Sequence, residues 1–443
     1  MTRRYCCIAL ALVLASALQA EDLDGRVDRE LPALVEIYER LHARPELSYQ
    51  EAETAAFIAD ELETLGFEVT RRVGRYREPQ LVSHGLVGVM ANGPGPTVLV
   101  RTDLDGLPVE EKTGLPYASR HTGTGLDGAA VATMHACGHD LHMTSFIGTA
   151  RLLAEQKAQW RGTLVMIGQP AEERGAGALA LLDDGLFERF PKPEMALALH
   201  AHAGLASGTV GLASGYSMAN VDTVDIHVAG RGGHGAYPHT TKDPVTLAAQ
   251  IITNLQTIVS RQISPFDPAV VTVGSIHGGT QHNVIPDRVD LQLTVRSYKP
   301  EVREQLLAAI KRTAIETARS AGFPDELLPQ TSIRDRYTPA NYNDPDLLDR
   351  LAAIWSEALG DDAIEWVEPV MAGEDFARYG MSAEIPTVLF WLGAVDPARI
   401  RAARQRGEVL PSRHSSGFAP LPGPAIRTGV EAMTSAVLDL LAP

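Results

Sequence analysis

At positions 97–105 the sequence reads Thr97-Val98-Leu99-Val100-Arg101-Thr102-Asp103-Leu104-Asp105. Its centre, Val98-Leu99-Val100, is an unbroken apolar run, which is typical of a strand that is buried on both faces in an α/β sheet. Asp103 and Asp105 follow directly, and open α/β sheets place their ligand sites at the carboxyl ends of strands. The stretch therefore predicts an α/β fold with polar chemistry at that edge, unless the two aspartates are simply solvated loop residues.

A second stretch, Met134-His135-Ala136-Cys137-Gly138-His139-Asp140-Leu141-His142, concentrates residues that bind metals. Gly138 lets the backbone turn, so that the thiolate of Cys137 and the imidazole of His139 could converge on one ion. Taken alone, the stretch also fits a buried cysteine beside surface histidines. Its meaning therefore depends on what the rest of the chain adds.

Later apolar strands end in the same kind of residue. The strand expected at 163–167 leads to the pair Glu172-Glu173, which could supply one ligand and one general base to the same water. The strand expected at 195–199 ends at His200. Paired glutamates are common on surfaces, but the recurrence of such strand ends favours one shared metal site.

The pattern of the chain changes near Tyr216. Residues 221–228 and 288–295 alternate between polar and apolar, which is typical of antiparallel strands with one face in water. Helices are expected over 243–259 and 301–321. Two helices on one face of an antiparallel sheet predict a compact α+β unit that interrupts the larger α/β unit.

Length and charge bound the organisation and the partners. The chain has 443 residues and a formal net charge of -16, which allows two domains and argues against a nucleic-acid or anionic-membrane surface. A small-molecule partner is expected instead. We expect a mixed, mostly parallel sheet with helices on both faces at 21–215 and 336–443, and the antiparallel insert with two helices at 216–335.

The first twenty residues resemble a secretory signal peptide. Arg3 and Arg4 precede the apolar run 8–15, and small residues follow up to Ala20. The run is too short for a stable membrane span, although a retained anchor is the alternative. Removal of residues 1–20 would leave Cys137 as the single cysteine, so we expect a soluble periplasmic or secreted protein.

Taken in order, these motifs resemble those of the M20 metallopeptidases. The similarity is greatest to the amidohydrolase branch, which includes hippurate hydrolases, N-acyl-amino-acid hydrolases and plant hydrolases of auxin conjugates. The chain departs from that branch at Ala203, where proline is common, and at Arg174, where glycine is usual. The motifs are Leu41 to Ser48, Asp103 to Pro108, Met134 to His142, Gln169 to Glu173, Gly232-Gly233-His234, Asn283 to Asp287, and His414.

The resemblance implies a site for two divalent metal ions. Glu172 would be the general base, and His234 would polarise the scissile carbonyl across domains or subunits, because the insert acts as a lid and mediates dimers in these enzymes. Asp105 would orient the residues around the ions. The implied metal ligands are Cys137, His139, Glu173, His200 and His414, and the substrate contacts are Asn283, Gly373 and, by charge and strand-end position alone, Arg296.

The implied activity is metal-dependent hydrolysis of the amide bond of N-acyl amino acids or related short peptide conjugates. Mixed nitrogen, oxygen and sulfur ligands suit Zn, Mn, Co or Ni equally. Two other functions stay open. One is a dipeptidase, carboxypeptidase or aminopeptidase on the same scaffold, and the other is a periplasmic binding protein that has lost catalysis.

Overall fold

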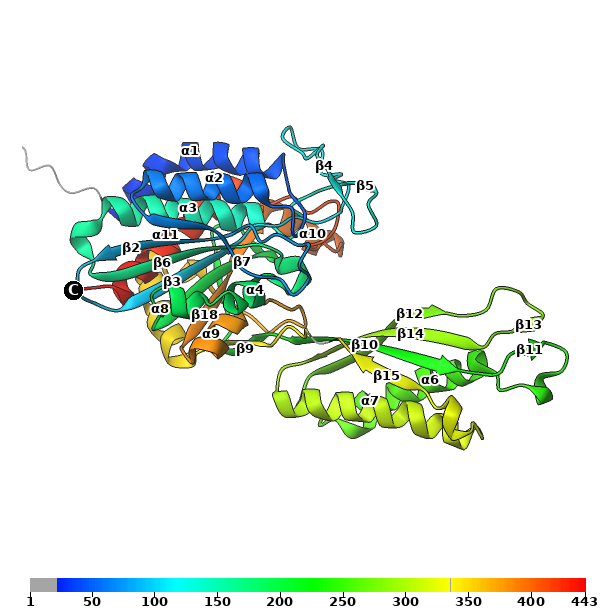
Figure 1. Cartoon of the computed structure of the whole chain (residues 1–443). Coiled ribbons are helices and arrows are strands. Elements are labelled where there is room, and N and C mark those ends of the chain that lie inside the picture. The colour runs from blue at the N-terminus through cyan, green and yellow to red at the C-terminus, as the bar shows by residue number, and fades with distance from the viewer. Residues whose placement is uncertain (1–21, 335) are drawn as a thin grey trace, which may run out of the picture.

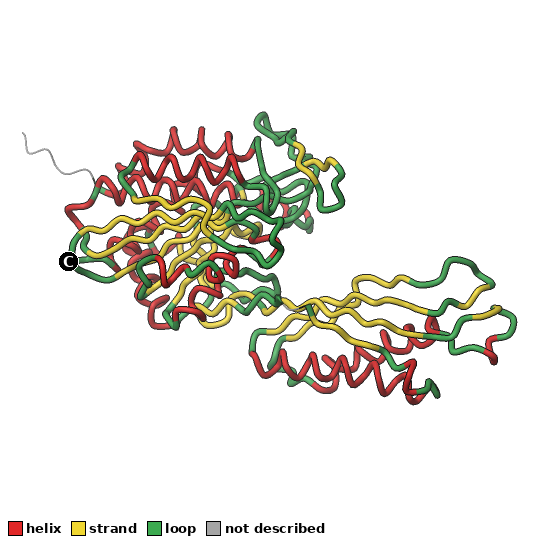
Figure 2. The backbone as a smooth tube through the Cα atoms, viewed as in Figure 1, coloured by secondary structure: helices red, strands yellow, loops and turns green. Residues whose placement is uncertain are grey.

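The larger unit of the fold is built on an eight-stranded sheet. The computed structural model describes residues 22–334 and 336–443, and it consists of two unequal units that meet at a narrow junction (Figures 1 and 2). In sheet order the strands are β1 (Glu68–Val73), β2 (Gly85–Asn92), β6 (Gly162–Gln169), β3 (Thr97–Asp103), β7 (Met195–Ala206), β18 (Thr387–Val395), β8 (Val210–Leu212) and β17 (Ile364–Trp366). β6, β3, β7 and β18 are parallel neighbours, as are β8 and β17. The pairs β1–β2, β2–β6 and β18–β8 are antiparallel. The mixed, mostly parallel sheet that the sequence predicts is therefore confirmed.

Helices cover both faces of this sheet (Figure 1). One face carries α1 (Leu23–His42), α2 (Ala52–Thr64), α3 (His139–Glu155), α8 (Pro345–Leu359) and α11 (Pro422–Leu440), and the other carries α4 (Gly177–Asp183), α5 (Leu186–Arg189) and α9 (Ala377–Ala383). Val98 and Val100 of β3 pack into the first core, whereas Leu99 packs into the second. Burial on alternate sides explains why the Val98-Leu99-Val100 run of this strand is apolar at successive positions.

Strand β7 is longer than its apolar run suggests. It extends to Ala206 instead of ending before His200, because β18 pairs with it up to Val395. His200 therefore projects from inside a buried strand, where neighbouring strands hold its position.

The smaller unit is a four-stranded antiparallel sheet with two helices on one face (Figure 1). Its apolar core joins the inward-facing residues of the strands to the buried sides of both helices, as the period-two pattern predicts. Its sheet order is β12 (Ala269–His277), β14 (Arg288–Ser297), β10 (Asn220–Ala229) and β15 (Gln330–Ile333), with α6 (Pro244–Gln262) and α7 (Pro300–Ser320) as the helices. Outside the two main sheets, three pairs of strands form short ribbons: β11 (Gly233–His234) with β13 (Val284–Ile285), β9 (Gly215–Met218) with β16 (Asn341–Asn343), and β4 (Thr122–Thr124) with β5 (Ala130–Ala132). In the larger unit, α10 (Pro397–Arg406) precedes the last loop.

Candidate metal centre

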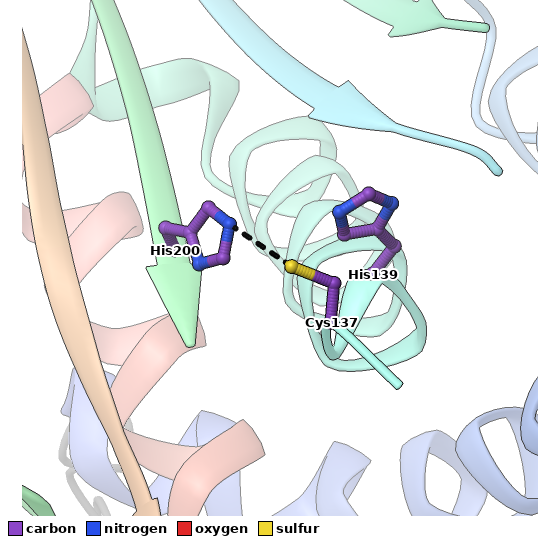
Figure 3. Close-up of side chains that lie close together, drawn as sticks. All are labelled: Cys137, His139 and His200. Atoms are coloured by element: carbon purple, nitrogen blue, oxygen red, sulfur yellow. Dashed lines mark hydrogen bonds between the residues drawn. The ribbon is translucent and has the colours of Figure 1, made fainter. Parts of the chain in front are cut away.

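A turn at Gly138 brings the first group of candidate ligands together. Gly138 has a φ of 91°, and a Cβ at this position would lie 2.8 Å from the Cβ of Ala201, so both conformation and space favour glycine. Cys137 Sγ lies 3.6 Å from His200 Nε2. The ligand atoms of Cys137, His139 and His200 all lie within 4.8 Å of one another, and all three residues are buried (Figure 3).

Cys137 also belongs to a second group. His414 Nε2 lies 3.2 Å from Cys137 Sγ and 3.4 Å from Glu173 Oε1, and these three residues again have ligand atoms within 4.8 Å of one another. The backbone N–H of His414 donates to the carbonyl of Ala136 at 2.8 Å, which ties the last loop to the Gly138 turn. The five residues that the sequence predicts as ligands thus form two groups with one shared thiol.

The hydrogen bonds around these groups fit metal ions. His139 Nδ1 lies 2.7 Å from the carbonyl of Asp105, which can only accept, so Nδ1 donates and Nε2 is the ring nitrogen that could bind a metal. Among the described residues, His139 Nε2 and Glu173 Oε1 are buried without any hydrogen-bond partner. Buried polar atoms usually have partners, and a thiol with imidazole and carboxylate groups suits a transition-metal ion better than Mg²⁺ or Ca²⁺.

Glu172 lies beside these groups on a strained turn. Ala171, just before it, has a φ of 50°, and the backbone N–H groups of Glu172 and Glu173 donate to the two carboxylate oxygens of Asp105, each at 3.1 Å. Ser48 donates to the same carboxylate at 2.6 Å. Burial, together with the charges of Glu374 and Glu173, raises the pKa of Glu172 well above its ordinary value. A carboxylate of this kind is suited to accept a proton, and the charge of bound cations would lower its pKa again.

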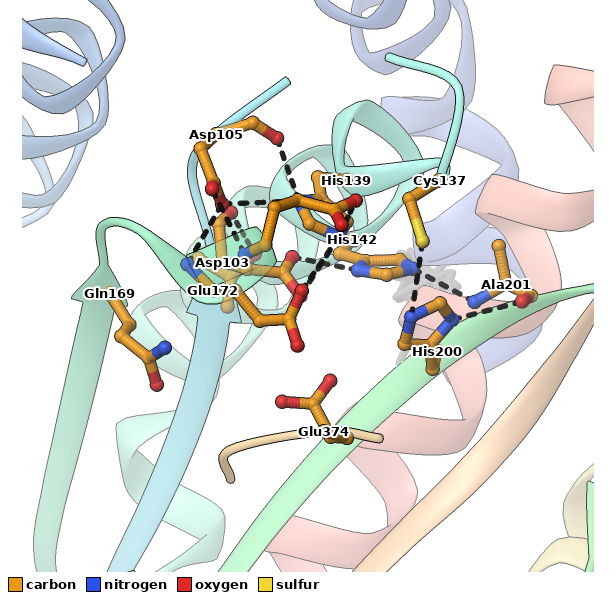
Figure 4. Close-up of polar contacts among 12 residues, drawn as sticks. Asp103, Asp105, Cys137, His139, His142, Gln169, Glu172, His200, Ala201 and Glu374 are labelled. Carbon is orange, nitrogen blue, oxygen red and sulfur yellow. Dashed lines mark hydrogen bonds and ion pairs between the residues drawn. The ribbon is translucent and has the colours of Figure 1, made fainter. Parts of the chain in front are cut away.

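A buried network behind the site was not assigned from the sequence (Figure 4). His142 Nδ1 lies 2.7 Å from Asp103 Oδ1, and His142 Nε2 accepts the backbone N–H of Ala201 at 2.8 Å. The Arg101 guanidinium donates to Asp103 and to Glu374, each at 2.8 Å. Arginine within an otherwise apolar strand was the available signal, because a fully buried charge needs partners.

The outer part of the site is a cavity of about 790 Å³ where the two units meet. Arg296 and Gly373 line it, and a Cβ at Gly373 would lie 3.6 Å from Arg296 Nη1. His234 and Asn283 do not line it. They lie at the β11–β13 ribbon, at the far end of the smaller unit (Figure 1), where Gly235 N–H donates to the carbonyl of Asn283 at 2.8 Å.

Comparison with known proteins supports this site. The sequence model of peptidase family M20/M25/M40 matches residues 99–406 of the chain. The chain belongs to peptidase family M20. It is 38% identical over 348 residues to an N-acetyl-L-cysteine deacetylase of Bacillus subtilis, covering 78% of this chain and 77% of that protein. It is 34% identical to an N-acetyldiaminopimelate deacetylase of Limosilactobacillus fermentum, covering 91% and 96%.

Solved structures agree with the fold and with metal binding in this M20 enzyme. A dinuclear metal-binding peptidase of the M20 family from Bacillus subtilis superposes with a TM-score of 0.72 and 30% identity, covering 94% of this chain and 99% of that one. With the two groups of candidate ligands, this likeness supports the expected pair of metal ions and a hydrolase.

One expectation from the sequence is wrong. A periplasmic or secreted location depended on a signal peptide at residues 1–20, which lie outside the described residues. The relatives that match this chain, which include two N-acetylcysteine deacetylases and a thermostable carboxypeptidase, give no support to a signal peptide, so the expected location is not upheld. Separately, no helix in the described part of the chain has the length and apolarity to cross a membrane.

Proposed function

We propose that this M20 enzyme hydrolyses the amide bond of N-acyl amino acids with two divalent cations. The observation that carries the proposal is the pair of ligand groups that share Cys137, next to a buried Glu172. The deacetylase relatives act on N-acetylated amino acids by their names. The candidate cations are Zn, Mn, Co and Ni.

In the proposed site, Cys137, His139 and His200 hold one cation, and Cys137, Glu173 and His414 hold the other. When bound, the cations polarise the amide carbonyl and favour the deprotonated form of the attacking water. Glu172 accepts the proton of that water and passes it to the leaving amine. Asp105 keeps the Glu172 turn in position through its two backbone hydrogen bonds.

His234 is proposed to stabilise negative charge on the substrate carbonyl from a second copy of the chain. Its ribbon lies away from the cavity of its own chain (Figure 1), so a residue contributed by a partner subunit is the simpler way to complete the site. Asn283 is tied to the same ribbon and would arrive with it. We accordingly propose residues 216–335 as a lid and dimerisation domain, and residues 21–215 and 336–443 as the catalytic domain.

A carboxypeptidase is the second candidate, because the chain is 33% identical to thermostable carboxypeptidase 2 of Saccharolobus solfataricus, covering 87% of this chain and 90% of that protein. A binding protein without catalysis is disfavoured by the presence of Glu172 together with every implied ligand.

The test is a screen of the purified protein, stripped with a chelator and then loaded separately with each of the four metals. N-acetyl and N-benzoyl amino acids are compared with dipeptides that have a free amine. Hydrolysis of the N-acyl substrates alone supports the amidohydrolase, and preferential cleavage of dipeptides supports a peptidase. Absence of metal-dependent hydrolysis of every substrate would overturn both.

A further inference from the structure

The cavity that leads to the metal centre is lined by an unusual number of arginines. Arg174 and Arg413 come from the larger unit, and Arg296, Arg334 and Arg336 come from β14 and the segment after β15. The carboxylates that line it in the described part of the chain are Glu172 and Glu173, which the proposed function assigns to the base and a metal ligand. The outer cavity therefore has an excess of positive charge in a protein whose net charge is -16.

Two of these arginines have unused hydrogen-bond donors. The backbone N–H of Arg174 donates to the carbonyl of Ala171, but its guanidinium makes no hydrogen bond or ion pair with any described residue. Arg296 uses Nε to donate to Thr294 at 3.0 Å, while the nearby carboxylate of Asp222 is already held by Arg303 at 2.8 and 2.7 Å. Guanidinium groups with free donors inside a cavity are suited to bind carboxylates in a bidentate manner.

The arginines of the cavity lie at two separate places on its lining. Arg296 lies against Gly373. The turn that carries Arg174 lies against the segment after β15, because a Cβ at Gly175 would be only 2.5 Å from Thr338 Oγ1. Arg334 and Arg336 belong to this same segment. Arg336 is partly engaged by Glu78 at 3.1 Å and Arg334 by Asp225 at 3.5 Å, which leaves the guanidinium of Arg174 as the main free donor there.

An apolar hollow of about 330 Å³ adjoins the cavity on another side. Ala203, Gly204 and Ser412 line both spaces. The rest of the hollow is lined by four apolar residues and by one pair of opposite charges: Ile400, Ala403, Val409, Leu410, Arg404 and Glu408. An apolar acyl group fits this hollow better than a carboxylate does. The arginine-lined side is then left for the amino acid.

We propose that this enzyme selects N-acyl amino acids whose side chain carries a second carboxylate. Arg296 receives the α-carboxylate, and Arg174, flanked by Arg334 and Arg336, receives the side-chain carboxylate. This inference rests on the proposed function and names its substrate class. Arg174 stands where the related branch usually has glycine, so the selectivity belongs to this chain.

The experiment compares kcat/KM for N-acetylglutamate with kcat/KM for the isosteric N-acetylglutamine, which keeps the α-carboxylate but has an uncharged side chain. We expect the parent to prefer N-acetylglutamate by about tenfold or more, as a charge-assisted contact allows, and the preference should fall as salt increases. Arg174→Gln should remove most of the preference, and Arg174→Glu should reverse it. The control is Arg401→Gln, because Arg401 is exposed on α10 and lines neither space.

A parent that hydrolyses both substrates equally, or an Arg174→Gln variant that keeps the full preference, overturns the inference and leaves the proposed function intact. If neither substrate is hydrolysed, the wider substrate screen decides the proposed function, and calorimetric binding to the metal-loaded protein decides the inference. Glutarate should then bind the parent more tightly than its monoamide does, and Arg174→Gln should lose this difference. Equal binding of the two compounds would overturn the inference, and circular dichroism checks that each variant is folded.

Discussion

The carboxylate of Asp105 accepts the backbone N–H of Glu172 at a distance of 3.1 Å, and its second oxygen accepts the N–H of Glu173. Asp105, which lies 67 positions before Glu172 in the chain, thereby holds the turn that carries both the proposed base and a proposed metal ligand. Because Asp105 also offers its backbone carbonyl to His139, one residue orients groups on both sides of the site.

Asp105→Asn should lower activity without removing the metals. The amide nitrogen of asparagine cannot accept an N–H, so one of the two hydrogen bonds to the turn is lost. We expect kcat to fall about tenfold to a hundredfold, with KM and metal content close to those of the parent. Steady-state kinetics with elemental analysis check this, and an unchanged kcat would contradict the role in positioning. Ser48→Ala, which removes only the Ser48 hydrogen bond to Asp105, serves as the milder control.

Glu172→Gln should remove the base while sparing the metal centre. A glutamine of the same shape cannot accept the proton, so turnover should fall by a factor of about 10² to 10⁴. Elemental analysis should still find two metal ions per chain, as in the parent. Glu173→Gln is the matched comparison, because that change should reduce metal content. Near-parent turnover of Glu172→Gln would show that another group accepts the proton.

The shared thiol predicts a distinct pattern of metal loss. Cys137→Ala should weaken both metal positions, because Cys137 belongs to both ligand groups. His200→Ala and His414→Ala should each weaken one position and leave the other occupied, since each belongs to one group. Metal titrations followed by calorimetry measure this difference. Loss of only one ion from Cys137→Ala would rule out a bridging thiolate.

The distant position of His234 predicts complementation between subunits. His234→Ala and Glu172→Gln should each be nearly inactive alone. When the two variants are mixed and allowed to exchange subunits, the chain with an intact Glu172 would receive His234 from its partner, and activity should return. A mixture no more active than its components would instead favour closure of the lid within one chain.

His42 predicts a loss of stability at alkaline pH. Burial lowers the pKa of His42, but hydrogen bonds to Asp140 and Glu111 outweigh it and raise the pKa to about 10. A raised pKa contributes stability in full below the unfolded value of about 6.5 and loses it as the pH rises through 10. Denaturant unfolding should show His42→Gln less stable than the parent by about 3 kcal/mol at neutral pH. The difference should shrink as the pH rises from about 6.5 to about 10, and a constant difference over that range would contradict an ionised His42.

Several features of the site were predictable because they depend on local patterns. The apolar run at β3 indicated burial on both faces, and Gly138 indicated the turn that lets Cys137 and His139 face one another. The strand that carries His200 was also identified. Its length was not, because the end of β7 depends on pairing with β18, almost two hundred residues later in the chain.

The sequence by itself determined the alternation of buried strands with polar ends and the antiparallel insert, because neighbouring residues decide these features, while its resemblance to the M20 family supplied the candidate metal ligands. Only the tertiary structure decided that Arg101 pairs with Glu374 across 273 positions, that five arginines line one cavity and that the His234 ribbon lies away from it (Figure 1). Such contacts join segments that are distant in the chain. Neither the hydrophobic periodicity of the sequence nor the spacing of its motifs indicates which of these segments meet when the sheets assemble.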